Sequence, residues 1–384
     1  MKKKFSDPYQ GNTICSNCIM DNSDPTITFN DDGVCIYCQH YANHLLRDWK
    51  PGEYNSSIYQ IVDRIKEDGK NKAHDCLIGI SGGLDSSYAA YIAAKTFGLR
   101  PLLFHTDAGW NSDTSTSNIE AICETLGLDL HVHVVNWDQL KDFHRSFFYS
   151  QVPFVDLPQD TVLFGALYQY AVRNNVKYVL TGGNNSTEGV RECLEWTYFA
   201  HDSLHNNDIQ NKFGSIELND LPMRDIFRYR IVDRFLHSMR VIKILDYVPY
   251  IKRDAIETLK NECGWQPYQM KHYESRFTKF FESFWTVEKH GFDKRRAYFS
   301  SEILSGQLER TEALKRIATP ELSSREMQQD FRYVASKLDF SVDEFQSIFE
   351  GENKSFRDYK NRLKWIQLGV ATMSLFGKER RLFR

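Results

Sequence analysis

Residues 74–88 have the sequence HDCLIGISGGLDSSY, in which an apolar run is followed by two glycines and a series of small polar residues. Residues 76–80 are a short apolar run before a turn, which is typical of a buried parallel strand. Gly82 and Gly83 permit a tight turn that a Cβ atom would obstruct, and a helix is expected to follow, capped by Asp85 or a neighbouring serine. A strand, a glycine turn and a helix start bring unpaired N–H groups and the helix dipole together. This stretch therefore predicts a site for a phosphate-like anion.

Two common phosphate-binding motifs do not describe this loop. The Walker motif requires a lysine after its last glycine, and the dinucleotide motif requires the spacing G-x-G-x-x-G. Residues 81–87 instead read SGGLDSS, which resembles the pyrophosphate loop (PP-loop) of the ATP pyrophosphatase superfamily. The resemblance implies an enzyme that splits ATP between its α and β phosphates. A plain glycine turn with a polar cap is the alternative, but it leaves the run of hydroxyl groups unexplained.

The same resemblance implies a role for each polar position of the loop. Asp85 orients Mg²⁺ on the phosphates of ATP, while backbone and hydroxyl groups hold the departing pyrophosphate. The residues that hold pyrophosphate are Ser81, Gly82, Gly83, Ser86 and Ser87. The loop residues expected to take part in catalysis are Ser81, Asp85 and Ser86.

Beyond the loop, short apolar runs alternate with helical patterns. This alternation predicts a doubly wound parallel α/β sheet with right-handed crossovers. It agrees with the adenine-nucleotide α-hydrolase-like (PP-loop ATP pyrophosphatase) fold that the resemblance implies. The further strands are predicted at residues 101–106, 130–135 and 176–181, and the helices at residues 112–126 and 160–174.

Ligands of such sheets bind at the carboxyl ends of the strands. By resemblance to the superfamily, the end of the second strand, Thr106 and Asp107, lies against the adenosine. Nucleotide contacts are also expected from the turn after the fourth strand, Thr181, Gly182 and Gly183, and substrate contacts from Asn184, Asn185, Glu188 and Arg191. Each group could instead simply end a strand or form a turn. Asp160, which follows Pro158, is expected to be a helix cap.

Four of the eight cysteines have the spacing of a metal site. Cys15, Cys18, Cys35 and Cys38 read C-x2-C-x16-C-x2-C, as in a four-thiolate zinc site of a zinc ribbon. Four sulfurs complete a tetrahedron and leave no open position, so the expected Zn²⁺ is structural. A redox dithiol and an iron–sulfur cluster are the alternatives.

Composition indicates a globular enzyme with a sizeable core. The 384 residues include 48 basic and 51 acidic side chains, a net charge of −3, so nothing suggests a general nucleic-acid binder. Neither a signal core nor a membrane-spanning apolar run is present, and a cytoplasmic location is expected. We predict three regions: a zinc module at residues 1–55, the nucleotide domain at 56–248, and a helical substrate or partner region at 249–384.

The last region is rich in basic and aromatic residues. The aromatic residues Tyr273, Phe277, Phe280, Phe281 and Phe284 fall on one helical stripe, so most of them are expected in the core. A cation opposite the loop would stabilise departing pyrophosphate. We therefore expect Lys271 to be catalytic and Tyr273 and Arg276 to contact substrate, although a solvated basic face would explain several of these residues.

Longer motifs narrow the family. The segments VPYIKRDAIETL, GWQPYQMKHYESRFTKFF and DKRRAYFSSEILSGQ follow the cysteine module and the loop in this order. Over roughly residues 10–320 the chain resembles the N-acetyl sugar amidotransferases of bacterial surface polysaccharide (lipopolysaccharide O-antigen) and flagellin glycan synthesis. The resemblance implies that a sugar acetamido group becomes an acetamidino group while ATP gives AMP and pyrophosphate. The expected cofactors are ATP, Mg²⁺ and Zn²⁺.

This reaction needs ammonia, and the remaining cysteines lack a recognisable glutaminase context. The resemblance implies a separate glutaminase with an ammonia-channelling companion, like those of histidine biosynthesis. One alternative is a PP-loop tRNA thiolase in which Cys193 carries sulfur, although the charge balance makes a nucleic-acid substrate less favoured. Another alternative is a non-catalytic scaffold, which the intact loop disfavours.

Overall fold

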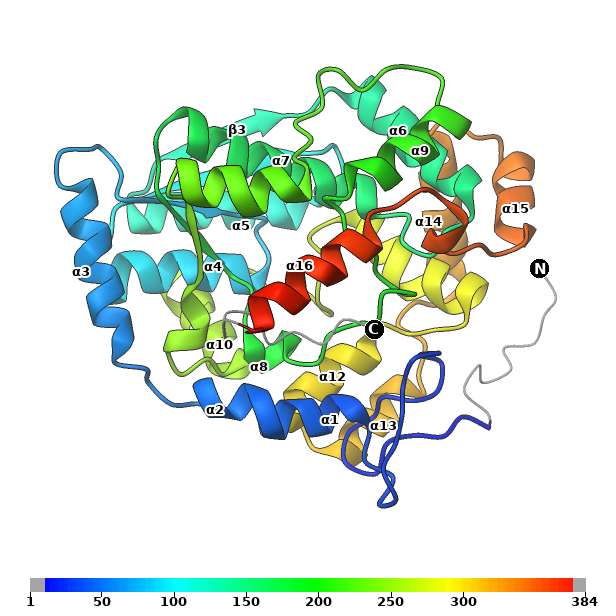
Figure 1. Ribbon diagram of the computed structural model, residues 1–384, viewed down its shortest axis with the longest axis horizontal. Helices are drawn as coiled ribbons and strands as arrows, with labels where there is room; N and C mark the ends of the chain where they lie inside the picture. Colours follow the sequence, from blue (N-terminus) through cyan, green and yellow to red (C-terminus); the bar gives the residue numbers. More distant parts are fainter. Residues whose placement is uncertain (1–10, 376–384) are drawn as a thin grey trace.

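The computed structural model describes residues 11–375, which surround one parallel β-sheet (Figure 1). Its five strands have the order β3-β2-β1-β4-β5, and each neighbouring pair is parallel. The strand order changes direction at β1, as in a doubly wound sheet, so the predicted fold class is confirmed. The strands are β1 (Cys76–Gly79), β2 (Pro101–Asp107), β3 (Leu130–Val134), β4 (Tyr178–Thr181) and β5 (Arg240–Lys243).

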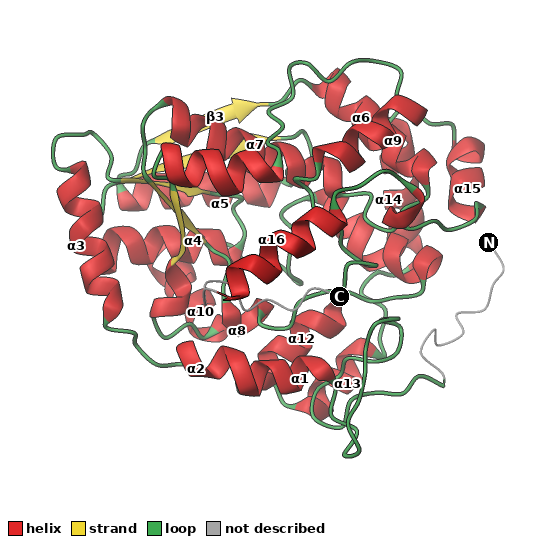
Figure 2. Ribbon diagram, viewed as in Figure 1, coloured by secondary structure: helices red, strands yellow, loops and turns green. Residues whose placement is uncertain are grey.

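Helices cover both faces of the sheet (Figure 2). Successive side chains of a strand point to opposite faces, and both faces of β1 are buried. Leu77 joins the apolar cluster that contains Leu167 of α7, whereas Ile78 joins the cluster that contains Ala89 of α4 and Ile119 of α5. The covering helices are α3 (Ser57–Gly69), α4 (Leu84–Tyr91), α5 (Asp113–Leu126), α7 (Leu157–Arg173) and α10 (Lys252–Cys263).

The fifth strand was not predicted from the sequence. β5 has the sequence RVIK and lies at the edge of the sheet, where its residues are exposed or only half-buried. An edge strand does not need the continuous apolar run that marks a buried parallel strand. Because this short strand begins and ends with a basic residue, the sequence pattern did not indicate a strand here.

The cysteine module is held against the C-terminal helices. The guanidinium group of Arg310 donates to the carbonyl oxygens of Cys15 (2.7 Å) and Cys18 (2.9 Å). Arg296, which is fully buried, forms a 3.0 Å ion pair with Asp21. Two antiparallel bridges close the module, and its helical part consists of α1 (Ile36–His40), η1 (Tyr41–Leu45) and α2 (Leu46–Asp48).

The C-terminal helices share their core with a helix of the sheet domain. Phe148 of α6 (Trp137–Ser150) packs edge-on against Trp285 and Phe345, with ring centroids 4.8 and 5.0 Å apart. Phe277 and Phe280 are buried in the same cluster, as their predicted stripe required. The helices of this region are α11 (Arg276–Phe280), η5 (Phe281–His290), α12 (Arg295–Leu304), α13 (Arg310–Ile317), α14 (Ser324–Lys337), α15 (Val342–Glu350) and α16 (Leu363–Leu375).

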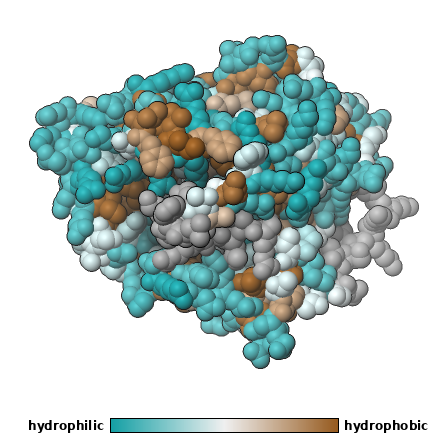
Figure 3. Space-filling model, viewed as in Figure 1, coloured by the Kyte–Doolittle hydropathy of each residue, from teal (hydrophilic) through white to brown (hydrophobic). Residues whose placement is uncertain are grey.

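Shorter elements connect these parts. They are η2 (Ile92–Thr96), α8 (Asn185–Glu188), α9 (Ser203–Phe213), η3 (Arg228–Leu236), η4 (Ile244–Tyr247) and η6 (Phe356–Asp358). The face shown in Figure 3 is mainly hydrophilic, with local apolar patches. Within residues 11–375, none of the helices has the length and apolar character needed to cross a bilayer.

Candidate active site

The glycine loop, residues 81–87, joins β1 to α4 as a strand, a turn and a helix start. Gly82 has φ +78°, and a Cβ atom there would lie 2.3 Å from the carbonyl oxygen of Ser115. Glycine is therefore required at this turn for both conformation and space. The N-cap residue of α4 is Gly83, without a side-chain cap, and Asp85 lies in the first turn. The expected cap by Asp85 or a serine was wrong.

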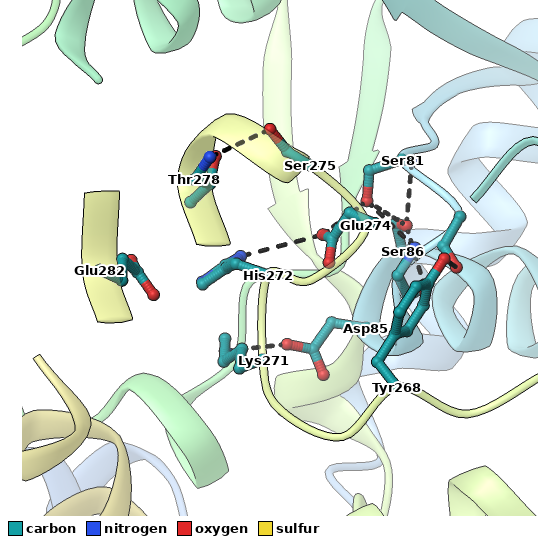
Figure 4. A network of polar contacts seen from close by, with 12 residues as sticks. Ser81, Asp85, Ser86, Tyr268, Lys271, His272, Glu274, Ser275, Thr278 and Glu282 are labelled. Carbon is teal, nitrogen blue, oxygen red and sulfur yellow. Dashed lines mark hydrogen bonds and ion pairs between the residues drawn. The ribbon is translucent and has the colours of Figure 1, made fainter. Parts of the chain in front are cut away.

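Two loop hydroxyl groups converge (Figure 4). The hydroxyl oxygens of Ser81 and Ser86 are 3.2 Å apart, and Ser86 Oγ also accepts the Ser81 N–H. The Gly83 N–H donates to Ser81 Oγ at 3.3 Å. Ser87 differs from its neighbours because it is fully buried and its hydroxyl group points into the protein interior. Ser81 and Ser86 thus line the cavity beside the loop, whereas Ser87 supports the loop.

A buried lysine connects the loop to α8. Lys271 Nζ lies 3.0 Å from a carboxylate oxygen of Asp85 and 2.8 Å from one of Glu188. Burial alone would lower the pKa of Lys271, but these two carboxylates raise it well above its usual value. Burial would raise the pKa of Glu188, whereas Lys271 and Lys243 lower it to about 2. Glu188 and Lys271 are therefore both charged at neutral pH. Tyr250 also donates its hydroxyl group to Asp85.

The loop opens into two adjoining cavities. The loop compartment, about 550 Å³, is lined by Gly83, Asp85, Ser86, Thr181, Gly182, Gly183 and Lys271 among others. The strand-end compartment, about 700 Å³, extends over the ends of β1 and β2 and includes Thr106, Asp156, Asp160, Arg191, Glu192 and Lys294. Their common wall contains Ser81, Asp160, Glu188, His272 and Glu274. One site can therefore hold a phosphate chain and a second substrate side by side.

Several predicted contact residues lie outside these cavities. The Asp107 carboxylate accepts from the N–H of Gly109 and the amide of Asn111, so it stabilises the turn after β2. Asn184 is buried and caps α8, and the Asn185 N–H donates to Asp246.

The two predicted substrate contacts of the C-terminal region are also directed elsewhere. Tyr273 donates its hydroxyl group to Glu321 at 3.0 Å. Arg276 forms a 3.0 Å ion pair with Asp330, and its guanidinium group lies 3.5 Å from the ring centroid of Tyr333. Both side chains make contacts within the C-terminal region, and neither is among the residues lining the two compartments.

Known families match two parts of the chain. Residues 57–190 match NAD synthase, and residues 274–371 match the family described as LPS biosynthesis protein WbpG-like, C-terminal domain. The chain carries a PP-loop domain of the NAD synthase type and a WbpG-like C-terminal domain. No curated protein matches it at a significant level.

Two solved structures are similar at low level. One is the NH3-dependent NAD synthetase from Campylobacter jejuni in complex with the nitrate ion, with 16% identity, a TM-score of 0.29, and coverage of 56% of this chain and 97% of that chain. The other is the U34-tRNA thiolase NcsA from Methanococcus maripaludis with its [4Fe-4S] cluster, with 14% identity, a TM-score of 0.32, and coverage of 69% and 81%. At these TM-scores neither similarity bears on function.

A buried charged group that the sequence did not reveal lies beyond the PP-loop. Asp156, not Asp160, is the N-cap residue of α7, and Asp160 lies in the first turn and lines both compartments. Lys294 is 2.7 Å from Glu192 and 3.6 Å from Glu282. The expectation that Asp160 caps the helix was therefore wrong. No sequence motif marks this group, because its members are dispersed over α7, the segment after α8 and the C-terminal helices.

The two aspartates of α7 have unusual ionisation. The Asp156 carboxylate accepts from Gln159 (3.0 Å) and Thr278 (2.8 Å). Burial, together with the charge of Asp160, raises the pKa of Asp156 to about 8. Burial also raises the pKa of Asp160, to about 6, although Lys294 opposes the shift. Asp160 therefore changes its charge near neutral pH, as a catalytic proton acceptor would.

His272 lies between the two compartments. It has a left-handed backbone, with φ 64°, and its ring faces Glu274 (Figure 4). Burial would lower the pKa of His272, but Glu282 and Glu274 raise it to about 9. His272 is therefore a cation at neutral pH within a wall of carboxylates.

The four predicted metal ligands meet in one buried cluster. The ligand sulfurs of Cys15, Cys18, Cys35 and Cys38 all lie within 4.8 Å of one another. The Cys15–Cys38 and Cys18–Cys35 sulfur pairs are 3.8 and 3.7 Å apart. A tetrahedral ion with Zn–S bonds of about 2.3 Å would place its sulfurs about 3.8 Å apart. The cluster thus fits one tetrahedral metal ion.

The other cysteines are not placed for substrate chemistry. Cys193 is buried in the apolar cluster that contains the four metal ligands, and burial, with the charge of Asp24, raises the pKa of its thiol. The whole set of eight cysteines lies within the described residues, and none of them lines either compartment.

Proposed function

We propose that the chain is an ATP-dependent amidotransferase that converts the acetamido group of a sugar into an acetamidino group during lipopolysaccharide or related glycan synthesis. The observation that carries the proposal is the double cavity, in which a PP-loop shares a wall with a compartment large enough for a sugar. The WbpG-like C-terminal domain supports the assignment to lipopolysaccharide synthesis. We place the reaction in the cytoplasm, where ATP and nucleotide-linked sugars occur.

The reaction proceeds in two balanced steps. The amide oxygen attacks the α phosphorus of ATP, the bond to the β phosphate breaks, and an O-adenylated imidate and pyrophosphate form. Ammonia then adds to the imidate carbon and gives up a proton, and the C–O bond breaks to release AMP and the acetamidino group. Neither step needs a nucleophile from the protein, so catalysis rests on positioning, charge stabilisation and proton transfer.

The chain's own residues divide these tasks between the compartments. The hydroxyl groups of Ser81 and Ser86 and the N–H groups at the start of α4 would hold pyrophosphate, and Lys271 would offset its charge. Asp85 would hold Mg²⁺, which neutralises phosphate charge when it is bound. Thr106 lines the strand-end compartment at the end of β2, where adenosine would lie.

Asp160 is our candidate for the base that accepts the proton from the attacking nitrogen. It lies on the wall that the two compartments share. A substrate that spans both compartments would therefore place its imidate carbon, which ammonia attacks, near Asp160. Lys294 forms an ion pair with Glu192, and His272 interacts with Glu282 and Glu274. Their positive charges also favour an ionised Asp160.

Ammonia is mostly protonated at neutral pH, so a dedicated source would be required. We propose a separate glutaminase and its ammonia-channelling companion, similar to those of histidine biosynthesis. The position of the cysteines supports this division because none of them can act as a glutaminase nucleophile from within the two compartments.

The nitrogen source also separates this proposal from a tRNA thiolase. AMP formation should require an N-acetyl sugar with ammonium salt, and glutamine should support it only when the glutaminase is added. Cys193→Ala should retain full turnover, since amidotransfer gives this thiol no covalent role. AMP release would be measured with sugar plus ammonium, sugar plus glutamine, and tRNA plus a sulfur donor. If AMP formed only with tRNA plus a sulfur donor, and Cys193→Ala abolished this activity, the thiolase would be favoured instead.

We infer that the metal of the four-cysteine site is zinc and that its role is structural. The purified protein should contain about one zinc per chain, and Cys35→Ser should lower Tm and folding yield because folding free energy is coupled to metal binding. Cys123→Ser, at a half-buried cysteine outside the site, is the matched control. Elemental analysis that found iron, or no metal in active protein, would contradict the assignment.

A further inference from the structure

The anion position of the PP-loop faces a carboxylate of the protein itself. The hydroxyl group of Ser81 donates to Glu274 at 3.1 Å (Figure 4). A Cβ atom built on Gly83 would lie 2.6 and 3.1 Å from the two carboxylate oxygens of Glu274. The carboxylate therefore rests directly on the glycine turn, at the place where phosphate oxygens would approach the loop.

Glu274 is ionised in this position. Burial would raise its pKa, but the positive charge of nearby His272 lowers it below the usual value. A carboxylate and a phosphate compete for the same hydroxyl and N–H donors, and two anions repel each other at short range. Pyrophosphate cannot bind the loop fully while Glu274 occupies it.

The backbone on both sides of Glu274 is fixed. Ser112 donates its N–H to the Glu274 carbonyl oxygen, and Arg276 donates its N–H to Trp110, both at 2.9 Å. On the other side, the indole N–H of Trp265 donates to the Gly82 carbonyl oxygen at 3.0 Å. Because the segment is tied to the loop region at both ends, the side chain of Glu274 is the part that can move.

A second partner for the carboxylate is close by. A ring nitrogen of His272 lies 3.8 Å from the same Glu274 oxygen that accepts from Ser81, so a small rotation away from Ser81 would shorten this ion pair to a charged hydrogen bond. We propose that Glu274 is a stand-in anion, which occupies the phosphate position of the PP-loop while no phosphate ligand is bound and moves to His272 when pyrophosphate or ATP binds. Its return to Ser81 would help to expel the product pyrophosphate.

The inference rests on the proposed phosphate role of the loop and is independent of the sugar and of the nitrogen source. Its test is therefore direct binding of magnesium pyrophosphate, measured by calorimetry without an acceptor. Glu274→Gln removes the competing charge and should bind pyrophosphate about ten-fold more tightly. In the wild type, pyrophosphate can bind only the fraction of protein in which Glu274 has left the loop, whereas in the variant nearly all of the protein is competent to bind. Glu274→Asp keeps the charge but is too short for the Ser81 contact, and it should also bind more tightly than the wild type.

Glu257→Gln is the matched control, with the same charge change at an exposed site on α10. It should bind pyrophosphate like the wild type. Equal affinity in the Glu274 variants and the wild type would overturn the stand-in role alone. Weaker binding in Glu274→Gln would overturn it in favour of a carboxylate that holds the Mg²⁺ of the ligand. Lack of pyrophosphate and ATP binding in every folded protein would overturn the phosphate role of the loop as well.

Discussion

Asp85→Asn should reduce AMP formation by on the order of 10²- to 10³-fold, the usual loss when a preorganised electrostatic contact to a transition state is removed. Asp85 is the loop carboxylate nearest to Lys271, and in our account it holds Mg²⁺ on the phosphate chain. The amide of asparagine has nearly the same shape but cannot hold the metal with a negative charge. The substitution should lower turnover without unfolding the protein, because buried Lys271 keeps its ion pair with Glu188 at 2.8 Å.

The folded state provides the control for this variant. The thermal transition of Asp85→Asn should remain cooperative, and Asp63→Asn, on the exposed side of α3, should have wild-type activity. The measurement is AMP release at saturating ATP with sugar and ammonium. Wild-type turnover in Asp85→Asn would remove the PP-loop from the mechanism.

Asp160→Asn should lower kcat by about 10²- to 10⁴-fold, the range of a general base, while the KM for ATP stays the same. The reason is that Asp160 lines the wall between the compartments and titrates near neutral pH, with a pKa raised to about 6 by burial. A base must be ionised to act. At a constant concentration of free ammonia, wild-type kcat should therefore rise as the pH passes about 6, and the variant should lack this rise.

Stability distinguishes this role from a structural one. An unfolded aspartate titrates near pH 3.9, whereas folded Asp160 does so near 6, so the folded protein binds the proton more tightly. Stability is then greatest below the unfolded pKa and falls as the pH rises towards 6. At neutral pH the ionised Asp160 destabilises the fold, and Asp160→Asn should have an equal or higher Tm. A lower Tm together with an unchanged pH profile would show that Asp160 only supports the fold.

The features that the sequence revealed are those encoded by neighbouring residues. The PP-loop and the cysteine pairs each need a few residues at fixed spacing, since one turn or one metal ion gathers them. The central strands were also recognisable, because a parallel strand buried on both faces must be apolar throughout. Ser87 shows the limit of this reasoning, because the start of α4 turns its hydroxyl group inward although it lies within the motif.

The buried charged group beyond the PP-loop could not be predicted because tertiary packing assembles it. Asp160, Glu192 and Lys294 come from three distant segments, and each has ordinary neighbours in the sequence. The position of Arg276 away from the two compartments has the same cause, because its partner Asp330 belongs to α14. Glu274 lies within a recognised motif, but its position against Gly83 depends on how the segment after Trp265 returns over the loop.

The proposed reaction exchanges an amide oxygen of a sugar for nitrogen. The most direct measurement is mass spectrometry of products formed by the purified chain from ATP, ammonium salt and a panel of nucleotide-linked N-acetyl sugars. With ¹⁵N-ammonium, we expect one sugar whose product has lost oxygen and gained one labelled nitrogen, in an amount equal to the AMP released. AMP and pyrophosphate formed without any labelled sugar product, or formed only with tRNA and a sulfur donor, would contradict it.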